Sequence, residues 1–448
     1  MDKLLAILLF LLAVGVAFID YPIGPLAALL AGCCALISIF LINKSFKGEE
    51  RRFLRRLFII ALMLRVLLAA VTYIFGLEMF FGGDSLTYDN AGYALYNLWF
   101  GYTERINQYY LNYATRASGS GWGMAYIVAA IYSLVGRNPF AVQLFNSVLG
   151  AATSCLIYIC AKRIFNNSRT AKISAILVAV FPSLILWSSQ GIKDGIICFL
   201  LVLAVNSLFS LQKKFSYSNV IVLLLSLIGI YTLRFYIFFA FEVAIFGSLF
   251  LNTQKSAVNL ARQVAVLIII TLGLTYLGVL RNAQSNIEVY GNLQTLQYSR
   301  QDMAKSAESG FGQDIDISTP TGAIQALPIG LAYLMLAPFP WQVTNLRQAI
   351  TLPELMIWWL LIPFLAVGIW YAIKNKLRES TAILLLTLLL TISYAIFQGN
   401  VGTAYRMRAQ MQIFYFIFIA VGITIWLEKR ENRNILRKNR VGKQYNNF

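Results

Sequence analysis

The chain has 448 residues, of which 59% are hydrophobic and 12% are charged. Soluble domains average about 45–50% apolar and about 25% charged residues, so this composition excludes a soluble enzyme and a disordered chain. Lysine and arginine number 37 against 19 aspartates and glutamates, which gives a net charge of +18. These basic residues cluster between apolar segments, a pattern that indicates membrane orientation rather than nucleic-acid binding.

The sequence contains no histidine. This excludes Ser-His and Cys-His triads and the zinc and haem sites that depend on imidazole. All five cysteines lie in apolar segments, where we expect them to pack as small hydrophobic side chains. Any chemistry therefore falls to carboxylates, lysine, arginine, tyrosine, serine or threonine.

Twelve apolar segments are close to the length of about 20 residues that a transmembrane helix needs. They cover 3–19, 24–43, 57–76, 140–161, 172–189, 195–211, 218–234, 236–252, 263–280, 354–373, 381–397 and 409–427. Basic clusters occupy alternate connections and the C-terminal tail, and the positive-inside rule assigns such clusters to the cytoplasm. Twelve crossings put every cluster and both termini inside. The sequence therefore predicts an all-α polytopic membrane protein with about twelve transmembrane helices.

Two further apolar segments, 121–136 and 326–341, are about 16 residues long, too short for ordinary spans. We expect them to be juxtamembrane helices on the outer face. The chain divides into five predicted units. The first two are an N-terminal transmembrane hairpin with a basic turn (1–56) and a catalytic transmembrane module (57–280) that includes a first outer loop (77–139). The last three are an outer loop with a juxtamembrane segment (281–353), C-terminal transmembrane helices (354–427) and a basic cytoplasmic tail (428–448). Most polar residues between the predicted spans then lie on the outer face of the membrane, where we expect the functional site.

Asp84 is the first candidate for chemistry, because it follows two glycines shortly after a predicted span ends. The next segment, 85–100, is compatible with a helix, so the carboxylate would stand at the membrane–water boundary. Two interpretations stay open on these residues alone. Asp84 either only caps the helix, as aspartate often does, or it is a catalytic carboxylate.

Four cations and one more carboxylate fall in predicted outer turns. Lys193 and Asp194 share one turn, where they could pair with each other or hold a lipid phosphate and a sugar hydroxyl. Arg234, Arg406 and Arg408 stand in two other outer turns, against the positive-inside bias. Phosphate binding by the guanidinium fork and snorkelling toward lipid headgroups both explain these arginines.

Three other features attract attention. Arg65 and Glu242 fall inside predicted spans, where a charged residue is functional or paired by default. Asp314-Ile315-Asp316 resembles the DxD motif of nucleotide-sugar enzymes. That match is short, and it lies on the outer face, which lacks nucleotide sugars.

The segment Gly83-Asp84-x-x-x-Tyr88-x-x-Ala91 resembles the D-x-x-x-Y-x-x-A signature of membrane glycosyltransferases of the GT-C fold. The similarity is closest to the branch of protein O-mannosyltransferases and lipid A aminoarabinose transferases (glycosyltransferase family 39), and it covers roughly 57–260 with one later element. Further motifs match in order and spacing: Leu134-Val135-Gly136-Arg137-Asn138-Pro139, Ala161-Lys162-Arg163-Ile164-Phe165, Phe181-Pro182-Ser183 before Lys193-Asp194, and Tyr405-Arg406-Met407-Arg408.

The resemblance implies a GT-C-like fold and a polyprenyl-phosphate-linked sugar donor, with transfer on the outer face and inversion at the sugar. Asp84 would be the general base that deprotonates the acceptor hydroxyl, and Asp194 would orient a substrate. Lys193, Arg234 and Arg406 would neutralise the leaving phosphate. Further substrate contacts are expected from Tyr88, Asp89, Arg116 and Arg408.

No cofactor is implied, because a monophosphate leaving group held by lysine and arginine does not require a metal. Many relatives carry Lys-Pro or Pro-Pro just before the segment 121–136, where this chain has Ala117-Ser118-Gly119-Ser120. Arg116 is therefore the nearest candidate for the cation that holds the lipid phosphate. The expected partners are the donor, a lipid, glycan or protein acceptor, and membrane lipids. The expected location is the cell inner (plasma) membrane with both termini cytoplasmic.

Two alternatives remain. An O-antigen or exopolysaccharide polymerase or ligase would also have about a dozen spans and a large outer loop, and Arg281, Arg300 and Arg347 in the segment 281–353 would serve it. A flippase or transporter of lipid-linked sugars would place charges near the midplane and show internal repeats. The sequence shows no such repeat, and its intramembrane charges are the only support for that alternative.

Overall fold

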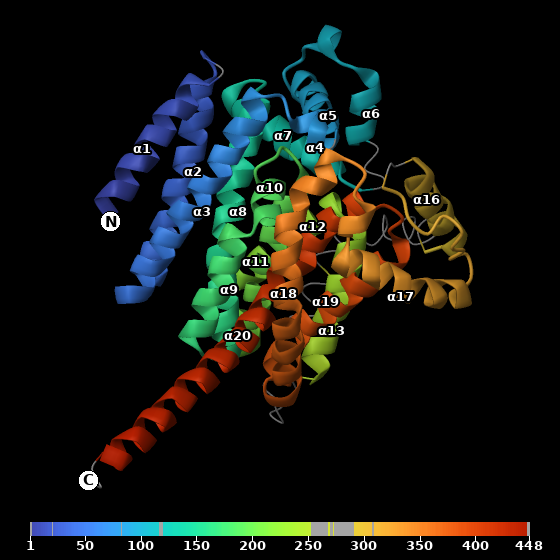
Figure 1. The fold of residues 1–448 in the computed structure, drawn as a ribbon. Coiled ribbons are helices and arrows are strands. Elements are labelled where there is room, and N and C mark those ends of the chain that lie inside the picture. The colour runs from blue at the N-terminus through green and yellow to red at the C-terminus, as the bar shows by residue number, and fades with distance from the viewer. Residues whose placement is uncertain are drawn as a thin grey trace.

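The structure, a computed structural model, describes residues 2–19, 21–81, 83–115, 120–251, 268, 272, 291–306 and 309–445. Within these ranges the chain forms helices and a single isolated bridge between Gly310 and Asn400, without a named strand (Figure 1). The predicted all-α class is confirmed. Most of the predicted span 263–280 lies outside the described residues.

Long apolar helices form the body of the bundle. Among the described residues, seven helices are long and apolar enough to cross a membrane: α2 (Gly24–Ser45), α3 (Gly48–Ile74), α8 (Pro139–Phe165), α11 (Lys193–Lys213), α18 (Leu346–Asn375), α19 (Leu377–Phe397) and the first 35 residues of α20 (Val401–Tyr445). Three other predicted spans form helices of 17 residues, at the lower limit for a crossing: α1 (Asp2–Phe18), α12 (Tyr217–Leu233) and α13 (Phe235–Leu251). The described helices thus support a multi-pass protein, with fewer full-length spans than predicted.

Short helices of the first loop gather near one end of the bundle, away from the projecting C-terminal part of α20 (Figure 1). They include α4 (Glu78–Phe81), α5 (Asp84–Trp99), α6 (Gln108–Thr115) and α7 (Trp122–Val135), with η1 (Thr103–Arg105) between α5 and α6. The later loop forms α16 (Leu293–Ser306), α17 (Pro320–Leu336) and η2 (Pro340–Gln342), and α16 and α17 lie at the side of the bundle (Figure 1). α7 and α17 confirm that the two short apolar segments are helical. Figure 1 shows α17 crossing the direction of α18. Their position relative to a membrane stays a prediction.

The predicted span 172–189 forms a bent pair of helices that together are long and apolar enough for one span. It is divided into α9 (Ser168–Val180) and α10 (Pro182–Ser188), which meet at an angle of 58°. The break follows from Pro182, which has no backbone N–H to continue the helix, and from the extended backbone of Phe181. Such a break frees carbonyl groups at the end of α9, and buried carbonyls need donors.

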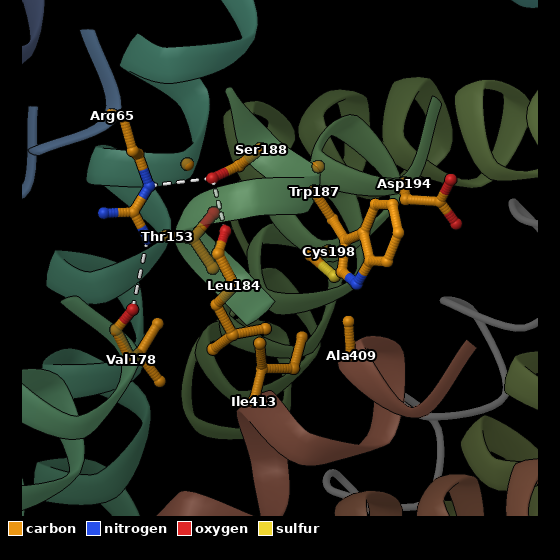
Figure 2. A pocket seen from close by; sticks show the side chains of 12 residues that line it. Arg65, Thr153, Val178, Leu184, Trp187, Ser188, Asp194, Cys198, Ala409 and Ile413 are labelled. Carbon is orange, nitrogen blue, oxygen red and sulfur yellow. Dashed lines mark hydrogen bonds between the residues drawn. The ribbon is translucent and has the colours of Figure 1, made fainter. Parts of the chain in front are cut away.

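Arg65 supplies those donors from α3. Its guanidinium is 1% exposed and donates to the carbonyl oxygens of Ala179 at 2.9 Å and Val178 at 3.2 Å. Its Nε donates to the Ser188 hydroxyl at 2.8 Å. Figure 2 shows Arg65 on one side of a cavity of about 20 Å³ and Asp194 on the other. The intramembrane arginine is therefore bound to the helix break rather than to Glu242.

The connection from α10 to α11 is fixed by α8. Asn146 is buried, and its amide donates to the carbonyl oxygens of Gln190 at 2.6 Å and Ile192 at 2.8 Å. These two bonds hold the turn that leads into α11. Lys193 and Asp194 begin that helix, so the helix break and Asn146 together position them.

α20 is a single helix of 45 residues. The predicted span 409–427 and the predicted tail 428–448 are continuous in it as far as Tyr445. Its middle is the most buried part of the chain, because Phe414, Phe416 and Phe418 are all fully covered. Figure 1 shows the basic C-terminal part leaving the bundle.

We expect Arg65→Met to lower the free energy of unfolding by about 2–4 kcal/mol, because two buried carbonyls and a buried hydroxyl lose their donor. Thermal unfolding of the purified protein in detergent measures this loss. Leu64→Ala is the matched control. The Leu64 side chain, next to Arg65 in the sequence, is exposed, so this substitution should change stability little. Equal unfolding temperatures for the two variants would contradict this account of the helix break.

Candidate active site

A buried carboxylate lies at the centre of the site. Asp194 is fully buried, and its Oδ1 lies 2.9 Å from Arg234 Nη2 and 3.2 Å from Gln410 Nε2. Its Oδ2 accepts from Arg406 Nε at 2.6 Å and lies 2.5 Å from Arg406 Nη2. Both oxygens are thus engaged by two arginines and an amide, as a buried charge requires.

Three separate elements bring these groups together. Asp194 stands in the first turn of α11, where the helix dipole favours an anion. Arg234 is the single residue between α12 and α13, and its extended backbone separates the two helices. Arg406 and Gln410 are four residues apart on α20 and therefore share one face. The sequence analysis missed Gln410, although this spacing could have revealed it.

Asp84 joins the same cluster from α5. Its Oδ2 accepts from Arg406 Nη1 at 2.6 Å, and its side chain is 49% exposed. Gly83 is the N-cap residue of α5, and no side-chain hydrogen bond caps the helix. Asp84 thus does not form the side-chain cap that we considered as an alternative. The Arg406 guanidinium bridges one exposed and one buried carboxylate.

Lys193 completes the cluster. Its side chain is buried, and Nζ donates to the Ser120 hydroxyl at 3.2 Å and lies 5.7 Å from the ring centre of Tyr88. Burial raises the pKa of the Tyr88 phenol well above its usual range, so this ring stays neutral beneath the ammonium. Gly121 adopts φ +100°, and a Cβ there would lie 2.7 Å from Lys193 Nζ. A glycine is therefore required at this close approach.

The cluster contains two arginines, one lysine and two carboxylates, so the arginines balance the carboxylates and Lys193 adds a positive charge when it is protonated. Trp187 closes one side, with the Arg406 guanidinium 5.9 Å from its ring centre. This arrangement can bind an anion and, beside it, accept a proton on the exposed oxygen of Asp84. Among the described residues, no group of three or more cysteines, aspartates and glutamates could hold a metal ion.

Two predicted substrate-binding residues, Asp89 and Arg408, do not join the cluster. Asp89 forms an ion pair with Arg137 at 2.6 Å and accepts from the Tyr132 hydroxyl at 2.5 Å. Arg408 is 2% exposed, and it donates to the carbonyl oxygens of Leu334 and Ala337 at the end of α17. It lies two residues from Arg406 and thus on another face of α20. Arg116 lies outside the described residues.

Two of the arginines that would serve a polymerase or ligase, Arg300 and Arg347, donate hydrogen bonds to backbone carbonyl oxygens. Arg300 is 1% exposed and donates to the carbonyl oxygens of Gly312 at 2.7 Å and Ile315 at 3.2 Å. Arg347 donates to the Met79 carbonyl oxygen at 3.4 Å. Arg281 lies outside the described residues. Glu242 is half-buried on α13.

Part of the sequence that contains this site matches a known protein family. Residues 120–280 match the family described as dolichyl-phosphate-mannose-protein mannosyltransferase. The chain resembles the GT-C membrane glycosyltransferases. The matched region is about a third of the chain and contains Lys193, Asp194 and Arg234, whereas Asp84 and Arg406 lie outside it. No curated protein sequence matches the chain.

Two solved structures of one archaeal enzyme align with this chain at low TM-scores. The oligosaccharyltransferase of the archaeon Archaeoglobus fulgidus in its apo form aligns with a TM-score of 0.41 and 13% identity over 71% of this chain. The same enzyme with an inhibitory peptide and a dolichol-phosphate aligns with a TM-score of 0.40 and 14% identity over 71% of this chain. In both alignments the chain spans 44% of the archaeal protein.

We expect Asp194→Asn to destabilise the protein by about 3–5 kcal/mol, because the buried Arg234 loses its counter-charge and Arg406 keeps only Asp84 as a partner. Asp84→Asn is the matched comparison, and it should change stability by less than about 1 kcal/mol since its carboxylate is half exposed. Thermal unfolding in detergent compares the two variants. A larger loss for Asp84→Asn would show that the cluster depends on the exposed carboxylate instead.

Proposed function

We propose that this protein transfers a sugar from a polyprenyl-phosphate donor to a hydroxyl group of a lipid, glycan or protein acceptor. The observation that carries the proposal is the Arg406 guanidinium, which bridges Asp84 and Asp194 beside two further cations. A base and an anion site thus lie next to each other. The family match over 120–280 supports the same class of reaction.

The donor phosphate would bind to Lys193, Arg234 and Arg406. Arginine forks and an ammonium form short, charge-assisted hydrogen bonds to phosphate oxygens. Charge grows on the phosphate as its bond to the sugar breaks, and fixed cations in a buried site stabilise that charge without reorganisation. In this proposal the site's own lysine and arginines supply the positive charge for this step.

Asp84 would act as the general base. The acceptor oxygen attacks the anomeric carbon, a new C–O bond forms, and the bond from that carbon to the phosphate oxygen breaks with inversion. The acceptor hydroxyl proton goes to Asp84, and polyprenyl phosphate leaves. Binding of the donor phosphate to Arg406 would loosen its contact with Asp84 and free the carboxylate to take the proton.

Asp194 would be a positioning residue rather than a group that contacts substrate. It is fully buried, and both of its oxygens are engaged by protein donors. Its negative charge holds Arg234 and Arg406 close together despite their mutual repulsion. This differs from the orienting contact with a substrate that we expected from the sequence.

The proposed location is the inner (plasma) membrane, with both termini cytoplasmic and the site on the outer face. α4 to α6 and the basic part of α20 lie near opposite ends of the long helices (Figure 1), which fits this orientation. The polymerase and flippase alternatives gain no specific support, because Arg300 and Arg65 are bound to backbone carbonyls.

The proposal predicts that Asp84→Asn lowers the rate of sugar transfer by about 10²–10⁴-fold, the usual contribution of a general base. The assay uses proteoliposomes with a panel of radiolabelled polyprenyl-phosphate sugars and native lipid extract as acceptor. Glu104→Gln, an exposed carboxylate in the same outer loop, is the control and should retain activity. Unchanged transfer by Asp84→Asn would overturn its assignment as the base.

We also expect Lys193→Met to lower kcat/KM for the donor by about 10²–10³-fold, because one of three cations facing the phosphate is lost. Lys374→Met removes an exposed ammonium at the end of α18 and should leave the kinetics unchanged. Steady-state kinetics at varied donor concentration measures both variants. Equal kinetics for the two would mean that Lys193 does not face the donor.

A further inference from the structure

A second cavity lies beside the site and is not used by the mechanism above. Its volume is about 460 Å³, within the range of about 300–1,000 Å³ that small-molecule sites occupy. The loop after α16, the segment after α17 and the first residues of α18 and α20 form its walls. The lining side chains that matter here are Gln313, Asp314, Tyr333, Phe339, Gln342 and Gln348.

The wall of this cavity is fixed to the start of α20. Phe311 donates its backbone N–H to the Gly399 carbonyl oxygen at 2.8 Å, and Val401 donates to the Ser309 carbonyl oxygen at 3.0 Å. The Ser309 hydroxyl donates to the Asn400 side chain at 2.8 Å. The cavity is therefore built into the folded protein, on the helix that carries Arg406.

Aromatic rings form one side of the cavity. The rings of Phe311 and Tyr333 stack with their centres 4.0 Å apart, and Phe339 meets Tyr333 edge-on at 5.4 Å. Trp341 does not line the cavity itself, but it stacks on Phe339, which does, with the ring centres 5.2 Å apart, and it is 75% exposed. An exposed indole that continues a stacked aromatic wall offers a flat face to a ligand.

The polar groups of the cavity suit a neutral ligand with many hydroxyl groups. Amides and hydroxyls both donate and accept, and the carboxylate of Asp314 accepts. Among the described residues that line the cavity, none is lysine or arginine, whereas phosphate ligands call for such cations. Polar hydrogen-bonding groups opposite aromatic faces match the two kinds of surface on a sugar ring.

We propose that this cavity binds sugar units of the acceptor, which makes the acceptor a glycan. The inference rests on the proposed function, because it assigns the phosphate-linked donor to the cationic cluster and the uncharged partner to the cavity. The two sites share a helix. Val401 lines the cavity, and Arg406 follows it on α20 by five residues, about 7.5 Å along the axis and about 140° around it.

The opposite wall of the cavity is linked to α4, the helix before Asp84. Gln348 lines the cavity, and its neighbour Arg347 donates to the Met79 carbonyl oxygen and lies over the Phe80 ring at 5.2 Å. Met79 and Phe80 belong to α4, which ends at Phe81, three residues before Asp84. The proposal requires a glycan seated in the cavity to extend past α4, so that its terminal hydroxyl reaches the carboxylate that would deprotonate it.

The test measures sugar binding without catalysis. Purified wild-type protein in nanodiscs is titrated with α-1,6-mannotriose, cellotriose and chitotriose, and binding is followed by saturation-transfer NMR. We expect at least one trisaccharide to bind, and we expect Trp341→Ala and Gln348→Ala to weaken it roughly tenfold each. Trp341→Phe should retain most of the binding, because it keeps the stacked ring.

Trp370→Ala is the matched control, since Trp370 is a tryptophan of similar exposure on α18 (68%, against 75% for Trp341), whereas Trp341 stacks on Phe339, which lines the cavity. No binding of any trisaccharide, or equal binding by wild type, Trp341→Ala and Gln348→Ala, would overturn the proposal. Equal weakening by Trp370→Ala would also overturn it, because exposed tryptophans in general would then explain the effect through detergent or lipid contact.

The failures of the two proposals can be told apart. Asp84→Asn should bind the trisaccharide as wild type does, because Asp84 does not line the cavity. If Asp84→Asn retains transfer while the cavity variants lose binding, the proposed mechanism fails and the cavity stands. If donor turnover depends on Asp84 while no trisaccharide binds, the transferase stands and its acceptor is not a glycan held here.

Discussion

A buried carboxylate paired with two arginines is the interaction on which the rest of this structure depends. Asp194 has no exposed surface, and a lone charge in such a place would be strongly unfavourable. Arg234 and Arg406 offset that charge, and each comes from a different part of the chain. The helices α11, α12 and α20 are therefore held together at this point by charge as well as by apolar packing. Arg406 also reaches the half-exposed Asp84, which links the buried pair to the surface where substrates would arrive.

The position of Asp194 depends on a second buried arginine. Pro182 breaks the helix before it, and Arg65 binds the carbonyls that the break exposes. Asn146 then fixes the turn that starts α11. A charged residue within a predicted span suggests transport from sequence alone, but here it compensates for a proline. The same bend sets the direction from which Lys193 and Asp194 enter the site.

The two candidate binding regions differ in chemistry in a way that suits two substrates. One is cationic and mostly buried, while the other combines amides, hydroxyls, a carboxylate and aromatic rings. Both lie along the start of α20, so a single helix would relate the phosphate of one partner to the sugar of the other. On this proposal the segment that forms the cavity would bind the acceptor, whereas the polymerase alternative would have assigned a role to the arginines of that segment.

The sequence by itself determined the class of the protein and the neighbourhood of its site. Hydrophobic segments and their lengths are local properties, so the all-α membrane class and the helix following Asp84 could be predicted. Pro182 was visible as a proline, but its effect on the span was not expected. Tertiary structure alone decided which charges meet, because the contacts of Arg406 with Asp194 and Asp84 join residues 212 and 322 positions apart. It also separated Arg406 from Arg408, since a two-residue step on a helix turns a side chain to another face.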